Sequence, residues 1–302
     1  MSACFWSPSI YRGFKGKRVS IDQAIKLDSN ILLRIKFTHI NHAKNFLFSY
    51  CFFILNNAFA QDGNISNPLP KVSEEWRFEV TPYVWAPGIK GTINFDNGLA
   101  KTADFSSSNV LSHLKSGAMM AAEVHKGNWG MMGDLVSATL QNSGSIPVYG
   151  GAATVADKIT LQQTVLTGAA TYTLTNTRNL YIDALLGARA IDVTATLNGN
   201  LVGTAEKETI SKKTSTVDPI IGAKGRYRIT DSSWYLPAYA DIGSGGGTTN
   251  LTWQVMAGVG KSFGSLVDAS LTYRALYYDM RAGGVLQKTT MQGPQAAITF
   301  KF

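Results

Sequence analysis

Apolar and polar side chains alternate at every second position over most of the chain from Trp76 to the C-terminus. In the first such run, Trp76 and Phe78 share one face, whereas Arg77 and Glu79 share the other. Because successive side chains of a β-strand point to opposite faces, this period of two predicts strands. The ranges that we expect to form strands are 76–86, 118–126, 129–140, 158–173, 180–194, 214–229, 233–242, 251–263, 266–279 and 289–302.

The connections between these ranges alternate in length. Short links at 127–128, 174–179, 230–233 and 264–265 separate long ones at 87–117, 141–157, 196–213, 243–250 and 281–288. Bacterial outer-membrane barrels have this layout, with short periplasmic turns and long external loops. We therefore predict an all-β fold, a transmembrane antiparallel up-and-down β-barrel. Periplasmic termini require an even strand number, so ten strands are expected and twelve are the alternative.

The first long link contains two smaller predicted elements. Gly88–Phe95 is a further strand candidate, which we interpret as one arm of an external hairpin. Asn109–Lys115 is expected to form a short amphipathic helix, with Val110, Leu111 and Leu114 on one side.

Alternation alone also fits a soluble sandwich or a lipocalin-like barrel, whose apolar face points inward. The charges decide between these alternatives, because a cation that faces lipid near the midplane costs about 2–4 kcal/mol. The charged faces must then point into the lumen, and their slight cationic excess predicts low conductance with mild anion preference if a pore exists. The predicted lumen charges are Arg77, Glu79, Asp183, Arg189, Asp218, Lys224, Arg226, Arg228, Asp241, Asp268, Arg274 and Lys301.

Aromatic residues fall near the predicted strand ends, where amphipathic rings collect at membrane interfaces. The last strand also alternates and closes on Phe302, which looks like the signal by which barrel proteins are inserted through the barrel-assembly machinery. The residues expected in the two aromatic girdles are Trp76, Trp129, Tyr181, Tyr227, Trp234 and Phe263 at the periplasmic rim and Trp85, Trp253 and Tyr277 at the outer rim.

The N-terminal part has a different pattern. Lys44, an apolar run of about ten residues and an Ala58-Phe59-Ala60 site have the order of a secretory signal peptide, so cleavage is expected before Gln61. Residues 44–60 are thus the signal core and cleavage site, and 61–75 a periplasmic segment before the barrel at 76–302. Residues 1–43 form an extension that we interpret as a gene-start artefact.

Processing changes the charge argument. The full chain carries a net charge of +8, but eight of its Lys and Arg residues and two acids precede Gln61, which leaves +2. Nucleic-acid binding therefore loses its main support. Both cysteines, Cys4 and Cys51, also leave with the N-terminal part, so the secreted chain has no disulfide.

The chain resembles a family of poorly characterised, porin-like outer-membrane β-barrel proteins of Gram-negative bacteria over essentially all of Gln61–Phe302. The resemblance implies a fold and a location in the cell envelope, but no substrate and no activity. It is carried by Trp76, Phe78, Pro82, Tyr83, Trp85, Gly88, Gly91, the Asp104–Leu114 segment, Trp129, Asp134 and Phe302.

Candidate chemistry is sparse. A lipid hydrolase would need a nucleophile activated by histidine, and His125 could be grouped with Glu123, Asp134 and Ser137. His125 lies near a short turn, at the wrong rim for outer-leaflet lipid, so we expect no enzyme. We interpret His113 as packed at the mouth or in the lumen, and the glycine-rich stretch 243–247 as a flexible loop. No residues have metal-site spacing, and no cofactor is expected.

The prediction is therefore an outer-membrane barrel that acts as a narrow porin-like channel or as a structural surface protein. The alternative is a surface barrel whose external loops bind lipopolysaccharide or another partner. Lys207, Lys212 and Lys213, in the link at 196–213, could bind its phosphates, although a solvated loop face explains them equally well.

Overall fold

The computed structural model describes residues 67–95, 100–148, 153–201, 207–245, 249–282 and 285–302. The predicted signal peptide and the extension before it lie outside these ranges. One short helix, α3 (Ser107–Ser112), interrupts a series of strands. The strands are β1 (Arg77–Trp85), β2 (Gly88–Phe95), β3 (Ala100–Phe105), β4 (Leu114–Lys126), β5 (Trp129–Val148), β6 (Ala153–Asn176), β7 (Leu180–Leu201), β8 (Lys207–Arg228), β9 (Trp234–Gly245), β10 (Thr249–Phe263), β11 (Val267–Ala282) and β12 (Val285–Lys301).

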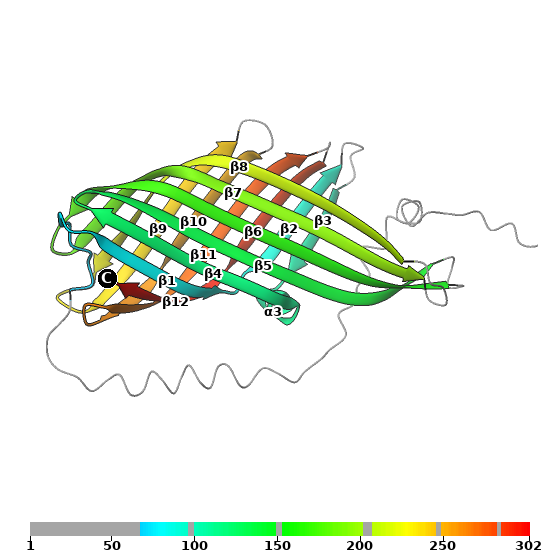
Figure 1. The fold of residues 1–302 in the computed structure, drawn as a ribbon, viewed down its shortest axis with the longest axis horizontal. Helices are drawn as coiled ribbons and strands as arrows, with labels where there is room; N and C mark the ends of the chain where they lie inside the picture. The colour runs from blue at the N-terminus through cyan, green and yellow to red at the C-terminus, as the bar shows by residue number, and fades with distance from the viewer. Residues whose placement is uncertain (1–66, 96–99, 149–152, 202–206, 246–248, 283–284) are drawn as a thin grey trace, which may run out of the picture.

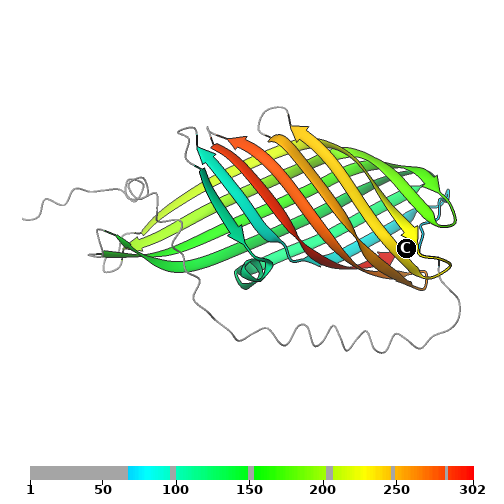
Figure 2. The same cartoon turned by 180° about the vertical axis from the view of Figure 1, so that it is seen from behind.

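Ten strands form an antiparallel barrel (Figures 1 and 2). β1 pairs with β4, each strand from β4 to β12 pairs with the next, and β12 pairs back with β1. At this closing seam Glu79 lies opposite Lys301 and Val80 opposite Phe300. Ladder pairing on both sides removes the exposed edges that an open sheet would leave. The predicted antiparallel barrel of ten strands is confirmed.

The remaining two strands, β2 and β3, extend the sheet to twelve. β12 pairs with β2 over Val285–Gln292 and with β1 nearer its C-terminal end. Gly88–Phe95 is thus the hairpin arm that the sequence predicted, and β3 is the other arm.

Helix α3 begins two residues earlier than predicted, because the Ser106 hydroxyl accepts a hydrogen bond from the Asn109 N–H at 3.3 Å and caps the first turn. Of the predicted apolar side, Val110 is buried, whereas Leu111 and Leu114 remain exposed.

The wall strands are longer than the sequence indicated. β6 has 24 residues and β7 and β8 have 22 each, whereas a membrane-spanning strand needs about 9–11. The predicted long loops at 141–157, 196–213, 243–250 and 281–288 were therefore wrong, because most of these residues continue the strands. Figure 1 shows β5–β8 running well beyond their neighbours at one end.

A change on the outward face explains this error. In the half of these strands nearer the tight turns that face is apolar, with Leu186 66% and Ile221 61% exposed. Further along it becomes polar, as at Ser137 on β5 and Thr194 on β7. The alternation that marks a membrane strand therefore stops while the backbone ladder continues.

The four tight connections β4–β5, β6–β7, β8–β9 and β10–β11 lie at one end of the barrel together with the C-terminus, and we call this the turn end (Figure 1). Gly127 and Gly264 take left-handed φ values of 58° and 72° in two of these turns, which glycine adopts without strain. The opposite end, which carries the β2–β3 hairpin and the extended strands, is the far end.

The part of the chain that the structure describes contains no helix with the length and hydropathy of a transmembrane helix.

Candidate functional site: the barrel interior

The alternation along each strand directs the charged side chains into the barrel. Eight of the twelve predicted lumen charges are buried residues, and the side chains of the other four are 13–18% exposed. Those four are Arg77, Lys224, Arg226 and Lys301.

Two further carboxylates, Glu123 and Asp134, also face the interior. The sequence left their faces open, because the alternation is weak around them. With these two residues the cationic excess expected among the lumen charges disappears.

Near the turn end, five charged residues form what we call the turn-end network: Glu79, Glu123, Lys224, Arg226 and Asp268. Arg226 donates to Glu79 at 3.0 Å and to Asp268 at 2.9 Å, and Lys224 donates to Glu123. These bonds join β1, β4, β8 and β11 across the lumen. Charges buried together in this way need such partners, because an unpaired one would lose its hydration without compensation.

A second cluster lies further from the turn end, around Arg274. Its guanidinium donates to Asp134 at 2.5 Å, to the Tyr83 hydroxyl at 2.9 Å and to Gln254 at 2.8 Å. The Tyr83 hydroxyl also donates to Asp134 at 2.5 Å. A separate pair, Arg189 and Asp241, is completely buried.

Apolar side chains pack across the interior towards the far end. Residues from β1, β5, β6, β7, β11 and β12 contribute, and all are buried. We call the following set the apolar layer: Trp85, Val136, Val165, Ile191, Leu276, Tyr278, Met280 and Met291. The Arg189–Asp241 pair is buried in the same interior.

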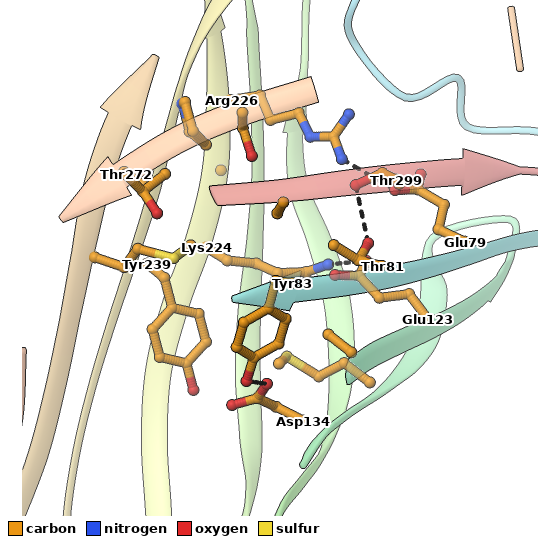
Figure 3. A pocket seen from close by; sticks show the side chains of 18 of the residues that line it. Glu79, Thr81, Tyr83, Glu123, Asp134, Lys224, Arg226, Tyr239, Thr272 and Thr299 are labelled. Atoms are coloured by element: carbon orange, nitrogen blue, oxygen red, sulfur yellow. Dashed lines mark hydrogen bonds and ion pairs between the residues drawn. The ribbon is translucent and has the colours of Figure 1, made fainter. Parts of the chain in front are cut away.

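Between the turn-end network and the Arg274 cluster lies a cavity of about 150 Å³. Figure 3 shows side chains of both groups directed towards this space, with Lys224 and Glu123 on one side and Tyr83, Asp134 and Tyr239 on another. Thr81 and Thr299 meet across the closing seam, with their hydroxyl oxygens 2.9 Å apart. We call this space the chamber.

The residues just before β1 lie at the turn end against the chamber. Leu69 is only 5% exposed, and Pro70 lines the chamber wall. Backbone carbonyls hold this segment: Pro68 accepts from Arg226 at 3.4 Å and Lys71 accepts from Arg77 at 2.8 Å. Ser73 accepts from the Gly127 N–H at 2.7 Å. We call Asn67–Ser73 the strap, which no sequence pattern had indicated.

Seven of the nine predicted girdle residues lie on the outward face. Trp76, Trp129, Tyr227 and Trp234 are 43–66% exposed, and Trp129 packs edge-on against Tyr172 with ring centroids 4.8 Å apart. The rings of Trp253 and Tyr277 stack with their centroids 5.7 Å apart. At the turn end, Lys261 Nζ lies 5.4 Å from the centroid of the Phe263 ring.

The other two girdle predictions, Trp85 and Tyr181, were wrong, because both side chains point inward. Trp85 is 1% exposed, lies 4.9 Å from the Arg274 guanidinium and donates to the Gly293 carbonyl. The Tyr181 hydroxyl donates to Asp183 at 3.1 Å. Each of these two residues lies on the same face of its strand as lumen charges. The face of the strand decides where a side chain points, so both rings point inward although they lie near a strand end.

The residues considered for a hydrolase do not assemble. His125 is buried, with its Nε2 3.4 Å from Glu123. Asp134 instead binds Tyr83 and Arg274, and the Ser137 hydroxyl contacts Thr164, 3.2 Å away. Among the described residues there is also no group of three or more metal-ligating side chains.

The structure places the remaining candidates in other elements or contacts than the sequence predicted. His113 caps the C-terminal end of α3, with its Nδ1 2.7 Å from the Asn109 carbonyl. Gly243 and Gly245 belong to β9 and not to a loop, whereas residues 246–248 lie outside the described ranges. Lys213 is on β8 with its side chain 64% exposed and its Nζ 3.7 Å from Asp192.

Neither a protein-family model nor a curated protein matches the sequence. Among solved structures, the outer-membrane protease OmpT of Escherichia coli superposes with a TM-score of 0.50 at 8% identity, covering 78% of this chain and 100% of OmpT. The chain therefore has the fold of an outer-membrane β-barrel protein.

Looser superpositions, which add nothing to this assignment, include Ail of Yersinia pestis and the NalP translocator domain of Neisseria meningitidis. Ail gives a TM-score of 0.34 at 10% identity, covering 76% of this chain and 99% of Ail. The NalP domain gives 0.35 at 10% identity, covering 84% of this chain and 94% of that domain.

Proposed function

We propose that this protein is a barrel of the bacterial outer membrane whose bore is closed, and that it serves as a structural or surface-binding protein and not as an open pore or an enzyme. In this orientation the turn end faces the periplasm and the far end faces outward. The apolar outward face supports residence in a membrane, where the surrounding hydrocarbon replaces water. A cleaved signal peptide and insertion through the C-terminal strand ending at Phe302 complete this proposal.

One observation carries the closed state: the interior is filled at successive levels. The Arg189–Asp241 pair is completely buried, and Ile191 and Leu276 of the apolar layer have no exposed surface. An open water-filled pore would leave the side chains along its path exposed to solvent, as in the large porins.

Planar-bilayer recording of the purified full chain tests this function. The wild-type protein is expected to give no discrete conductance steps. Replacing Trp85→Ala together with Arg274→Ala removes two side chains that stack across the bore, so this double variant is expected to conduct. The matched control is Trp129→Ala with Lys213→Ala, which removes an exposed aromatic and an exposed cation. Regular conductance steps from the wild-type protein would contradict the proposal.

A second candidate function is the binding of lipopolysaccharide phosphates at the far end. It is supported by the exposed Lys213 on β8, beyond the apolar part of the outward face. Lys207 and Lys212 are on the same strand. Replacement of all three lysines by glutamine should weaken binding to lipopolysaccharide micelles at low salt, whereas replacement of Lys126 and Lys261 at the turn end should not.

A further inference from the structure

The chamber presents a neutral surface although many charged residues line it. Glu79 is bound by Arg226, Glu123 by Lys224, and Asp134 by Arg274. Each charge therefore has its opposite within contact distance. A molecule entering the chamber would meet satisfied ion pairs, hydroxyls and amides.

Three neutral polar groups on the chamber wall are unsatisfied, the Tyr239 hydroxyl and a facing pair on β11 and β12. Thr272 Oγ1 and Gln295 Oε1 are buried atoms, and neither has a hydrogen-bond partner in the described part of the chain. Both residues are 6% exposed, and they lie opposite each other on β11 and β12. A buried group of this kind has lost its hydrogen bonds to water without replacement, so a hydrogen-bonding occupant is favoured.

The chamber has the size of a small molecule. A cavity of about 150 Å³ holds a ligand as large as benzene, which has about six non-hydrogen atoms. An apolar occupant would leave Thr272 and Gln295 unpaired. An anion or a cation would have to be buried beside carboxylates and guanidinium groups that are already neutralised, where the Arg274 Nε–H is the one charged-group donor on the described chamber wall without a partner.

For the described part of the chain, we infer a route into the chamber from the turn end. Towards the far end the Arg274 cluster and the apolar layer, including Trp85, fill the bore. Towards the turn end the strap lies across the chamber, held by backbone carbonyls and the buried Leu69 side chain. No strand ladder includes the strap, so it can move without breaking the barrel wall.

We propose that the chamber binds a small neutral polyol of about six non-hydrogen atoms, which enters from the turn end past the strap and hydrogen-bonds to Thr272 and Gln295. This site goes beyond the proposed function and rests on it only for the assignment of the turn end to the periplasm. Binding to the chamber and conductance through the barrel are separate measurements, so either proposal can fail alone.

The test compares three probes of equal size on the full chain in detergent micelles, by saturation-transfer NMR titration. Glycerol represents the neutral polyol, lactate an anion and benzene an apolar molecule. We expect saturable glycerol binding at least tenfold tighter than lactate binding, and no benzene binding. Equal or tighter binding of lactate or benzene would overturn the ligand class, and no saturable glycerol binding would overturn the site.

Variants locate the binding. Thr272→Val keeps the shape of the side chain but removes its hydroxyl, and Gln295→Met removes the amide, so each should weaken glycerol binding about fivefold through one lost hydrogen bond. Thr171→Val is the matched control, because Thr171 is also buried and its hydroxyl is also unpaired, but it does not line the chamber. An equal loss in the control, or no loss in the two chamber variants, would overturn the proposal.

A second measurement tests the route. Leu69→Ser should loosen the strap and speed glycerol exchange severalfold, measured by NMR line shape, while the dissociation constant changes less. Lys71→Ser is the control, because the Lys71 side chain is exposed and only its carbonyl holds the strap. Unchanged exchange in Leu69→Ser would overturn entry past the strap.

Discussion

The same ten strands enclose two different interiors. Beside the turn end the interior is polar, joined by ion pairs across the lumen, and contains a cavity of about 150 Å³. Towards the far end it is a packed apolar layer around Trp85, Ile191 and Leu276. Packing and open space are thus separated along the barrel axis: buried apolar side chains pack together towards the far end, and the chamber retains space and unsatisfied polar groups.

The largest stability effect is expected where a buried charge loses its partner. Arg189→Ala leaves Asp241 buried and should lower the free energy of unfolding by about 3–5 kcal/mol. Urea unfolding of the protein in lipid vesicles, followed by tryptophan fluorescence, measures this change. The double variant Arg189→Met with Asp241→Leu replaces the pair by apolar side chains and should recover most of the loss. A double variant as unstable as the single one would contradict this interpretation.

The next effect concerns the apolar layer. Leu276→Ala opens a cavity among fully buried side chains, and we expect a loss of about 2–5 kcal/mol in the same unfolding assay. Leu271→Ala on the same strand is the control, because Leu271 is 58% exposed on the outward face and its removal leaves no internal cavity. Similar losses in both variants would show that the far half is not packed as a core.

A third variant sharpens the distinction between the interior and the outward face. Leu186→Arg places a cation on the outward face in the middle of β7, where hydrocarbon contact should make it destabilising by about 2–4 kcal/mol. Thr194→Arg, on the same face beyond the apolar part, should change stability little. Equal tolerance of arginine at both positions would argue against a membrane around Leu186.

The smallest effect is expected at the exposed Lys213–Asp192 pair. Both side chains are about half exposed or more, so Lys213→Ala should change the free energy of unfolding by about 0–1 kcal/mol. Salt titration of the same unfolding transition checks this value. A loss comparable to that of Arg189→Ala would mean that the extended strands are held together more strongly than their solvent exposure allows.

Much of the fold could be predicted from the alternation alone, because a strand between lipid and a charged lumen has the strongest possible contrast between its faces. The ten wall strands follow from this contrast, and Gly88–Phe95 was expected as one hairpin arm, whereas its partner β3 was not predicted. Strand length could not be predicted, since polar residues on the outward face, such as Ser137 and Thr194, remove the contrast without ending the ladder.

The candidate site could be predicted only in part. Charged residues such as Arg189 and Asp241 were predicted to point into the barrel, because they lie on the polar face of their strands. Glu123 and Asp134 were left open because apolar residues occupy both faces around them. The strap has no periodicity, so its position depends on tertiary contacts such as that between Arg226 and the Pro68 carbonyl.

The divided pairing of β12 bears on how the molecule is made. This final strand is the common neighbour of β1, β2 and β11, and it joins residues more than two hundred positions apart, as in Glu79 and Lys301. Contacts of such high sequence separation form slowly. The cylinder therefore cannot be completed until Val285–Lys301 has been synthesised, and a polypeptide truncated before Val285 would retain a lengthwise slit, with β1, β2 and β11 each lacking one neighbouring strand.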